Sequence, residues 1–258
     1  MFRPTAHLRI VVLAIALAGC AAPERAPEPP RTDLIEVSEP RGVTVAMLGA
    51  TGMVGGYVLD EALSRGYNVR VLARTPAKLD DYAQAFPDRI SIVQGDALVY
   101  EDIVALLKGS DAVVSALGPV KADGKAAKTL NTTATEHVLL AMTGEGIDRY
   151  VLVAGAAVVM PGDKRSFTGS MIRQSALLVL RSAVKDKQAE YDRLAASDAA
   201  WTFVRPPRIL DESYEKPPIA SLETPSSWSL RAGELAVFLL DQLETDEYVR
   251  EGPFLYSK

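Results

Sequence analysis

The sequence has few of the residues that bind metals. It contains one cysteine, Cys20, and two histidines, His7 and His137, among 258 residues. Zinc and iron–sulfur sites need several such ligands, so no metal site is expected, and one cysteine cannot form a disulfide within the chain. The chain also has no Gly-x-Ser-x-Gly motif and no histidine in the expected site, so hydrolase chemistry has no support.

The sequence also lacks an excess of positive charge. It has 28 lysines and arginines against 33 acidic residues, a formal charge of −5. We find no basic stripe and therefore do not expect a nucleic-acid partner. Apolar residues make up 48% and charged residues 24%, which is ordinary for a globular protein.

The first residues have the pattern of a processed export signal. Two arginines and the apolar run Ile10–Leu17 lead to Leu17-Ala18-Gly19-Cys20. This end resembles the lipobox of bacterial lipoproteins, in which the cysteine is acylated and becomes the new N-terminus. The run is far shorter than the roughly 20 apolar residues of a spanning helix. We expect a lipoprotein signal peptide at 1–19 and lipidation of Cys20; the alternatives are a plain membrane anchor or a misassigned start.

The next residues are expected to be a tether. Residues 20–42 contain five prolines and many polar residues, a composition that stays extended and does not pack. The acyl chains would hold the protein on a bilayer, since each buried CH₂ contributes about 0.8 kcal/mol. We therefore expect membrane attachment in the bacterial cell envelope, with the domain in the periplasm or outside the cytoplasmic membrane.

Residues 43–258 are expected to form a single domain. Short apolar runs typical of strands alternate with longer helical stretches, a pattern that predicts an α/β fold: a Rossmann-type, doubly wound parallel sheet. Pro206–Ser227 contains five prolines and is expected to be a long loop on the substrate side. The expected strands are Val43–Leu48, Asn68–Ala73, Ile90–Val93, Ala112–Ser115, Tyr150–Val153, Trp201–Val204 and, last, Pro253–Tyr256; the expected helices are Met53–Arg65, Pro76–Phe86, Tyr100–Leu107, Lys125–Gly144, Ser175–Ala196 and Ala232–Leu243.

A glycine motif, Gly49-x-x-Gly52-x-x-Gly55, lies between the first strand and the first helix. In this context the glycines allow a tight turn, close approach of a pyrophosphate, and packing of the helix on the strand. The helix start at Met53 and Val54 offers free N–H groups and partial positive charge, and Thr51 adds a hydroxyl. The motif predicts a dinucleotide site; the alternative is a tight turn without a ligand.

The end of the second strand favours the phosphorylated cofactor. The strand ends in Arg74, with Lys78 one turn further, where an acidic residue would bind the ribose hydroxyls of NAD. Arg74 can hold a 2′-phosphate through two charge-assisted hydrogen bonds. We therefore expect NADP(H) as the cofactor; the alternative for both cations is an exposed surface position.

Two further strand ends are expected to line the cofactor, because ligands of open parallel sheets lie beyond the carboxyl ends of the strands. Gly95-Asp96-Ala97 follows the third strand, where Asp96 can accept a hydrogen bond from the adenine amino group or serve as a helix N-cap. Ala116, Leu117 and Gly118 follow the fourth strand, and their backbone is expected beside a ribose.

Together these motifs resemble the atypical short-chain dehydrogenase/reductase superfamily, in its NAD(P)H-binding, NmrA-like branch, which includes flavin reductase (biliverdin reductase B). The resemblance runs from Val43 to Tyr256 and also rests on Asp111–Gly118 and Trp201–Pro207. It implies NADPH at the sites above, with Pro207 and Ala154, at the end of the fifth strand, beside the nicotinamide. It also implies hydride transfer to a flavin, quinone or tetrapyrrole, or cofactor sensing without turnover.

Two features depart from the family pattern. None of the nine tyrosines has a lysine four residues on, so the Tyr-x-x-x-Lys dyad is missing, and alanines stand at 154 and 156 where the family usually has serine or threonine. Lys187 is the best remaining catalytic candidate, because relatives place a histidine or lysine there; the alternative is a solvated lysine. Arg208 is a candidate contact for an anionic substrate, and Glu190 is expected to be exposed.

We therefore expect an NADPH-dependent reductase of a small, flat acceptor, because the cofactor carries the chemistry and positioning can suffice. One alternative is a non-catalytic NAD(P)H-binding or sensing lipoprotein, since an exported domain meets little free NADPH and no twin-arginine pair is present. Another is an envelope scaffold that binds no nucleotide. The sequence indicates neither the acceptor nor the oligomeric state.

Overall fold

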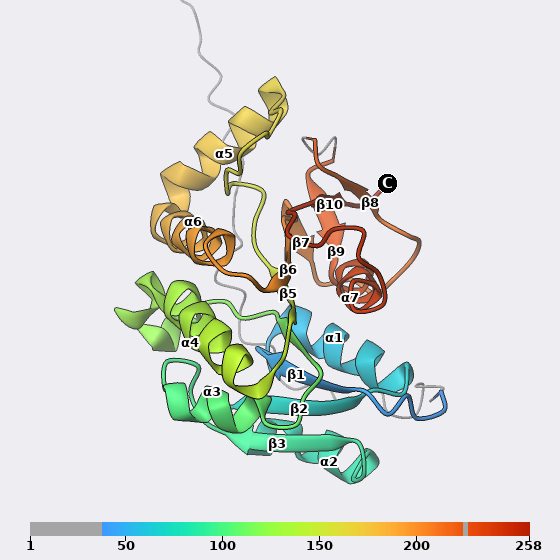
Figure 1. The fold of residues 1–258 in the computed structure, drawn as a ribbon. Coiled ribbons are helices and arrows are strands. Elements are labelled where there is room, and N and C mark those ends of the chain that lie inside the picture. The colour runs from blue at the N-terminus through green and yellow to red at the C-terminus, as the bar shows by residue number, and fades with distance from the viewer. Residues whose placement is uncertain (1–37, 224–226) are drawn as a thin grey trace, which may run out of the picture.

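A computed structural model describes residues 38–223 and 227–258 and contains a six-stranded parallel sheet (Figure 1). The strand order is β3-β2-β1-β4-β5-β6, so the chain moves outward from β1 in one direction and then, from β4, in the other. This is the predicted Rossmann-type topology, and each of the six predicted strands is found within one residue. The strands are β1 Thr44–Leu48, β2 Asn68–Ala73, β3 Ile90–Gln94, β4 Ala112–Ser115, β5 Arg149–Val153 and β6 Ala200–Val204.

Apolar cores cover both faces of the sheet, which explains the continuous apolar runs of its strands. In β1, Val45 and Met47 point into one core with α1 (Met53–Ser64) and α7 (Ala232–Asp241). Ala46 and Leu48 point into the other core, with α3 (Tyr100–Leu107), α4 (Leu130–Glu145) and α6 (Arg181–Ala195). The helices lie on the two sides of the sheet in Figure 1. The prediction of a doubly wound α/β domain is confirmed.

The prediction of one helix over Ser175–Ala196 is wrong. The chain forms α5 (Phe167–Val179) and then α6, separated by Leu180, whose φ of −122° and ψ of 29° lie outside the helical range. The hydroxyl of Ser166 accepts a hydrogen bond from the N–H of Gly169 and caps α5. The sequence pattern failed here because no proline or glycine marks the break at Leu180, so the two helices read as one apolar and charged stretch.

Two other predicted helices begin differently. Pro76–Phe86 is a 3₁₀ turn, η2 (Pro76–Leu79), followed by the short helix α2 (Asp80–Ala85). The predicted helix Lys125–Gly144 begins with a separate 3₁₀ turn, η4 (Ala126–Lys128), before α4. Helix ends are the least regular part of a helix, and their last turn is often 3₁₀.

Pro206–Ser227 is not simply a loop. It contains β7 (Arg208–Leu210), which pairs with β9 (Ser229–Arg231), and β8 (Ile219–Ser221), which pairs with β10 (Phe254–Tyr256). These strands form two small sheets beside α7 (Figure 1). Each strand has three residues, too few for a sequence pattern, and its partner lies far along the chain.

The described start of the chain packs on the domain. The N–H of Ser38 donates to the Ser64 carbonyl at 2.9 Å, and the Arg41 guanidinium donates to Glu244 at 2.7 Å. Residues 38–42, expected in the tether, therefore lie against the domain. Cys20 and the predicted signal peptide lie outside the described residues. Within 38–223 and 227–258, no helix is long and apolar enough to cross a membrane.

Candidate dinucleotide-binding site

The predicted cofactor residues follow the carboxyl ends of the sheet strands. Because all six strands are parallel, these ends meet at one edge. The strand order reverses between β1 and β4, and ligands of such sheets lie beyond this point. The residues brought to this edge are Gly49, Thr51 and Gly52 with Met53 and Val54 after β1, Arg74 and Lys78 after β2, Asp96 and Ala97 after β3, Ala116, Leu117 and Gly118 after β4, Ala154 after β5, and Pro207 after β6.

The three glycines of the motif have different roles. Gly49 has φ of +82°, and a Cβ there would lie 2.7 Å from the Ala116 carbonyl, so the turn requires glycine. A Cβ on Gly55 would lie 2.0 Å from the Gly49 carbonyl oxygen, so glycine is also needed where α1 packs on this turn. Gly52 is different, because its backbone is extended and exposed and its Cβ would approach only the Gly49 oxygen, at 3.3 Å. The fold does not require glycine at position 52.

The start of α1 faces this open position. The first helical hydrogen bond runs from the N–H of Gly56 to the carbonyl of Gly52 at 2.9 Å. The N–H groups of Met53, Val54 and Gly55 therefore have no hydrogen-bond acceptor within the helix. Such N–H groups, together with the positive end of the helix dipole, bind anions. Gly52 leaves room beside them, so this corner fits the pyrophosphate of a dinucleotide.

Arg74 forms an ion pair with a residue that sequence reasoning missed. Its Nη1 lies 2.5 Å from Oδ1 of Asp123, in the 3₁₀ turn η3 (Lys121–Asp123) that follows β4. Asp123 also accepts a hydrogen bond from the N–H of Val120 at 2.6 Å. Because β1 lies between β2 and β4, this pair draws the loop after β4 across the end of β1. Lys78 is exposed on η2 (Pro76–Leu79), which begins two residues after Arg74.

The loop after β3 is tightly tied. Oδ1 of Asp96 accepts a hydrogen bond from the N–H of Leu98 at 2.9 Å, which closes a turn. Asp96 is not the N-cap of α3, because that position belongs to Val99. The methyl group of Ala97 is buried in the core, so this residue can meet a cofactor only through its backbone. In this loop only Asp96 can therefore contact a cofactor with its side chain.

The ends of β5 and β6 lie side by side. The N–H of Ala154 donates to the Val204 carbonyl at 2.7 Å, and the N–H of Ala156 donates to the Pro206 carbonyl at 2.8 Å. This brings Ala154 close to Pro207, as the resemblance implies. Across β4, Ala116 and Leu117 are partly buried, whereas a Cβ on Gly118 would meet nothing within 4 Å. The ligand edge therefore has free space beside Gly118, whereas hydrogen bonds join the chain segments that follow β5 and β6.

A buried ion pair anchors the loop that follows β5. Arg205, 1% exposed, binds both carboxylate oxygens of Asp163 at 2.8 Å and lies 3.9 Å from the ring centre of Phe254. Burial alone would raise the pKa of Asp163, but the hydrogen bonds from Arg205 and from the Met160 N–H, with the charge of Arg165, outweigh burial and lower it. The carboxylate therefore stays ionised and holds this loop at the site. Arg208 is exposed at the start of β7.

Lys187 reaches the end of β5, so its interpretation as a solvated lysine is wrong. Its Nζ donates to the Val153 carbonyl at 2.8 Å and lies 2.9 Å from Oε2 of Glu190. Its side chain is only 15% exposed. Because Val153 is the last residue of β5, the ammonium group lies next to Ala154, at the ligand edge of the sheet.

Glu190 is buried, and the prediction that it is exposed is wrong. Its side chain is 3% exposed, and Oε1 accepts a hydrogen bond from the Thr135 hydroxyl at 2.9 Å. The Thr135 hydroxyl also lies 3.2 Å from that of Tyr150. Burial raises the pKa of Glu190, and the charge and hydrogen bond of Lys187 partly offset that rise. Helical spacing could have signalled the pair, because residues three apart share a helix face.

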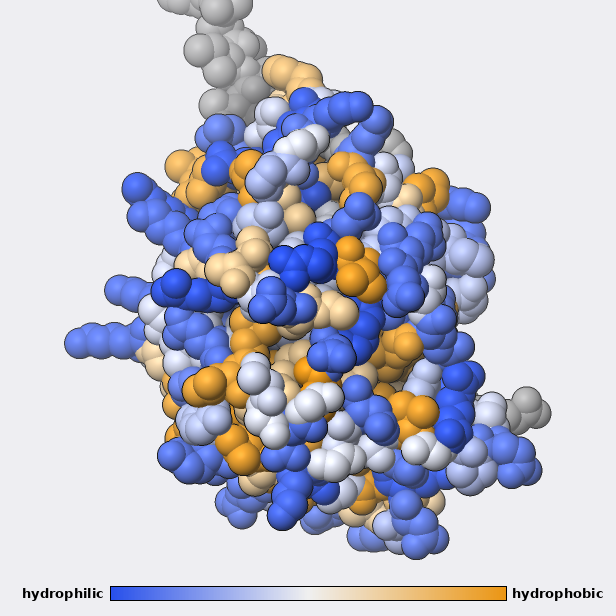
Figure 2. Space-filling view, in the orientation of Figure 1, coloured by the Kyte–Doolittle hydropathy of each residue, from blue (hydrophilic) through white to orange (hydrophobic). Residues whose placement is uncertain are grey.

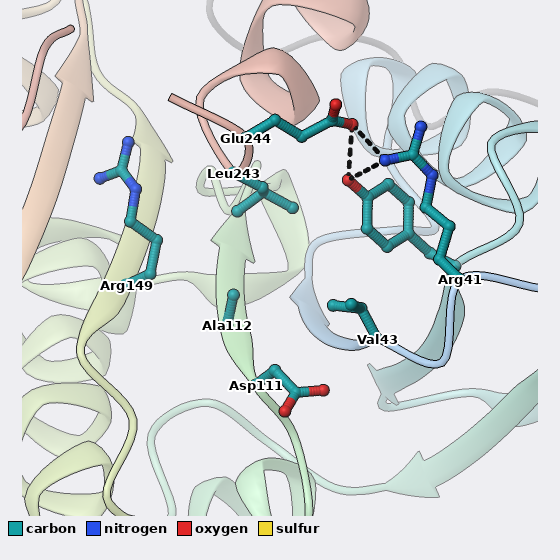
Figure 3. Close-up of a pocket in the computed structure, with 8 residues that line it drawn as sticks. Arg41, Val43, Asp111, Ala112, Arg149, Leu243 and Glu244 are labelled. Atoms are coloured by element: carbon teal, nitrogen blue, oxygen red, sulfur yellow. Dashed lines mark hydrogen bonds and ion pairs between the residues drawn. The ribbon is translucent and has the colours of Figure 1, made fainter. Parts of the chain in front are cut away.

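A separate cavity of about 430 Å³ lies at the opposite edge of the sheet (Figure 3). Its lining includes Val43 just before β1, Asp111 and Ala112 at the start of β4, and Arg149 at the start of β5. These are amino ends of strands, so the cavity is remote from the predicted cofactor edge. Burial lowers the pKa of Arg149 to about 10, although its guanidinium is held by the Ala200 and Gln242 carbonyls.

Comparisons with known proteins agree with this geometry. The model of a family described as NAD(P)H-binding matches residues 49–246. Cinnamoyl-CoA reductase 1 of Arabidopsis thaliana is 24% identical over 175 residues, which are 65% of this chain and 50% of that protein. The chain thus spans half or less of the length of the first curated relatives it matches.

Solved structures share the fold. The anaerobillin reductase ChuY of Escherichia coli O157:H7 has a TM-score of 0.69 at 17% identity, covering 83% of this chain and 97% of its own. A Burkholderia pseudomallei protein provisionally described as exported has a TM-score of 0.65 at 23% identity, covering 83% of this chain and 99% of its own.

Substitution of Gly52 should separate binding from folding. Aspartate is a good N-cap, so Gly52→Asp should keep or increase the free energy of unfolding, but its charge and bulk should weaken nicotinamide dinucleotide binding at least tenfold, or about 1.4 kcal/mol. Gly55→Ala, the control, should lose about 1–3 kcal/mol of stability through overpacking. Urea denaturation and calorimetric titration measure both effects. Unchanged binding in Gly52→Asp would mean that the cofactor does not use this corner.

Proposed function

The chain belongs to the NAD(P)H-binding family, and from this premise we propose that it is an NADPH-dependent reductase that transfers hydride to a small, flat acceptor such as a flavin, quinone or tetrapyrrole. The observation that carries the proposal is the position of Lys187 at the end of β5, on the same edge as the glycine turn. An ammonium group beside the expected nicotinamide position gives the site a proton donor. The name of the ChuY protein, an anaerobillin reductase, supports an acceptor of this kind.

The preference for NADPH rests on Arg74 and its surroundings. The Arg74 side chain is 53% exposed and that of Asp123 is 4% exposed, so solvent reaches their ion pair from the side of the guanidinium. Charge-assisted hydrogen bonds to a 2′-phosphate are worth about 1.5–3 kcal/mol each. A phosphate can therefore replace Asp123 as the partner of Arg74, and Lys78 on η2 adds a second positive charge.

Lys187 has a definite role in the proposed reaction. A bound nicotinamide would supply the hydride. An ammonium group has three N–H donors. In Lys187 one faces the Val153 carbonyl and one faces Glu190, which leaves the third for the acceptor. This N–H donates the proton that accompanies the hydride, so the acceptor gains two electrons and two protons in all, one of the protons being carried by the hydride. Solvent then returns a proton to Nζ, and Glu190 keeps the amine in place.

The location of the domain is part of the proposal. We infer that Cys20 is lipidated and that the domain is held at the membrane of a bacterial cell envelope. The supporting observation is the sequence pattern of Ile10–Leu17 followed by Leu17-Ala18-Gly19-Cys20. The Burkholderia pseudomallei protein that shares the fold is also provisionally described as exported.

A non-catalytic, nicotinamide-sensing lipoprotein is the second candidate. The missing Tyr-x-x-x-Lys dyad and the alanines at 154 and 156 favour it, because they remove hydroxyl groups from the reacting end of the site. An exported domain would also meet little free NADPH. In this case the site would bind the cofactor but not turn it over.

Turnover by the purified protein decides between these two functions. We expect NADPH oxidation that depends on an added acceptor, tested with a panel of flavins, quinones and bilins, with kcat on the order of 1–1000 s⁻¹. Calorimetry on the same preparation measures NADPH binding. Binding without turnover for every acceptor would contradict the reductase proposal and favour the sensing function.

Arg74 and Asp123 should have opposite effects on cofactor choice. Arg74→Glu should weaken NADPH binding by about tenfold to a hundredfold, as expected for the loss of one to two charge-assisted bonds, and change NADH binding little. Asp123→Asn removes the competing carboxylate and should strengthen NADPH binding. Dissociation constants for both cofactors measure this. Equal changes for NADPH and NADH would show that Arg74 does not read the 2′-phosphate.

Lys187→Met should lower kcat by about 100-fold or more, because a positioned general acid contributes about 10²–10⁴-fold. NADPH affinity should stay within a few-fold of the original value. Lys185→Met is the matched control, since Lys185 is an exposed lysine on the same helix. Steady-state kinetics and a solvent isotope effect on kcat give the readout. The role fails if the two variants have the same kcat.

A further inference from the structure

A basic segment stands out in this acidic protein. Residues 164–185 contain five lysines and arginines and no acidic residue, although the whole chain has 28 basic and 33 acidic residues. The acids that flank this segment both point inward, since Asp163 binds buried Arg205 and Asp186 binds Asn131 in the core. No acidic side chain from within the segment therefore offsets its positive charge. The overall charge of the chain hid this feature from the sequence analysis.

Helix α5, within the basic segment, exposes large apolar side chains. Phe167 is 82% exposed, Met171 49% and Leu178 86%. Their spacing of four and seven residues places them on one helix face. A surface helix normally turns such a face toward the core, so in α5 the usual arrangement is reversed. We call Phe167, Met171 and Leu178 the apolar stripe.

The apolar stripe lies at the edge of the molecule. Helix α5 packs against α6 and extends away from the sheet (Figure 1). The space-filling view shows apolar surface among hydrophilic side chains at this end of the molecule (Figure 2). Val179, 55% exposed, extends the apolar surface at the end of α5. This surface has the form of a docking site.

The basic side chains around the stripe differ in their exposure and in the groups that they contact. Arg165 is engaged by Asp163 and by the carbonyls of Ala156 and Val158. By contrast, Arg181 and Lys185 are exposed on the first turns of α6, directly after α5. Lys164, just before α5, is also exposed, and its Nζ lies 3.9 Å from the exposed carboxylate of Glu223. Exposed cations thus lie at both ends of the apolar stripe.

We propose that α5 docks on an anionic lipid bilayer, with the apolar stripe among the upper acyl chains and Lys164, Arg181 and Lys185 on the headgroups. An apolar helix face flanked by cations is what interfacial helices use. The charge selects this occupant, because anionic headgroups complement a segment that has five basic residues and no acidic residue of its own. The lipid anchor predicted at Cys20 would keep the domain close to such a surface. The proposal does not depend on the redox function.

Fluorescence of an introduced tryptophan tests the proposal. The full chain carrying Phe167→Trp is mixed with phosphatidylglycerol vesicles whose acyl chains are brominated, and the signal of the unchanged chain, with Trp201 and Trp228, is subtracted. We expect a shift to shorter wavelength and at least twofold quenching, both absent with phosphatidylcholine vesicles. Leu140→Trp is the matched control, because Leu140 is 60% exposed on α4, outside the basic segment, and should not be quenched.

A second variant removes the apolar stripe itself. Phe167→Ser with Leu178→Ser should weaken binding to phosphatidylglycerol vesicles at least tenfold, whereas Val99→Ser with Leu140→Ser, also exposed, should change it less than twofold. Equal quenching at positions 167 and 140, or none at 167, would overturn the proposal. So would a dimer in sedimentation analysis that the Phe167 and Leu178 changes dissociate, because a second copy would then cover the stripe.

Discussion

The backbone of Gly49 lies directly against that of Ala116, and the arrangement of the site depends on this contact. No side chain fits between the two turns, since a Cβ on Gly49 would come within 2.7 Å of the Ala116 carbonyl. The chain therefore leaves β1 and β4 at one point, where the sheet order reverses. From there α1 begins with free N–H groups, and Gly52 keeps the approach to them open. One close backbone contact thus creates the corner where we expect the phosphates of the dinucleotide to bind.

Two ion pairs flank this corner, and their burial gives them opposite behaviour. In the pair of Arg74 with Asp123 the arginine is 53% exposed and the aspartate 4%, so another anion can reach the guanidinium from solvent. The pair of Lys187 with Glu190 is buried, and breaking such a pair costs about 3–5 kcal/mol. The first pair suits exchange with a ligand. The second suits a fixed group at the reacting end of the site.

One loop connects the ligand edge of the sheet to helix α5. The ligand edge holds the carboxyl ends of the strands, and the loop after β5 leads from this edge into the basic segment and α5. The same loop is held by buried Arg205 through Asp163. The exposed stripe on α5 therefore follows directly after a loop that this buried ion pair holds in place. A surface in contact with α5 would lie beside the loop that follows the reacting end, which links the location of the domain to the access of an acceptor.

The sequence by itself determined the sheet, the glycine turn and the family, because these depend on neighbouring residues: apolar runs predict buried strands, and glycine spacing reports backbone geometry. The tertiary structure alone decided which charges meet. Asp123 lies 49 residues from Arg74, Val153 lies 34 from Lys187, and Thr135 lies 55 from Glu190. The break at Leu180 and the outward stripe of α5 also escaped prediction. Local patterns show which residues are apolar or charged, but only packing determines which of them water reaches.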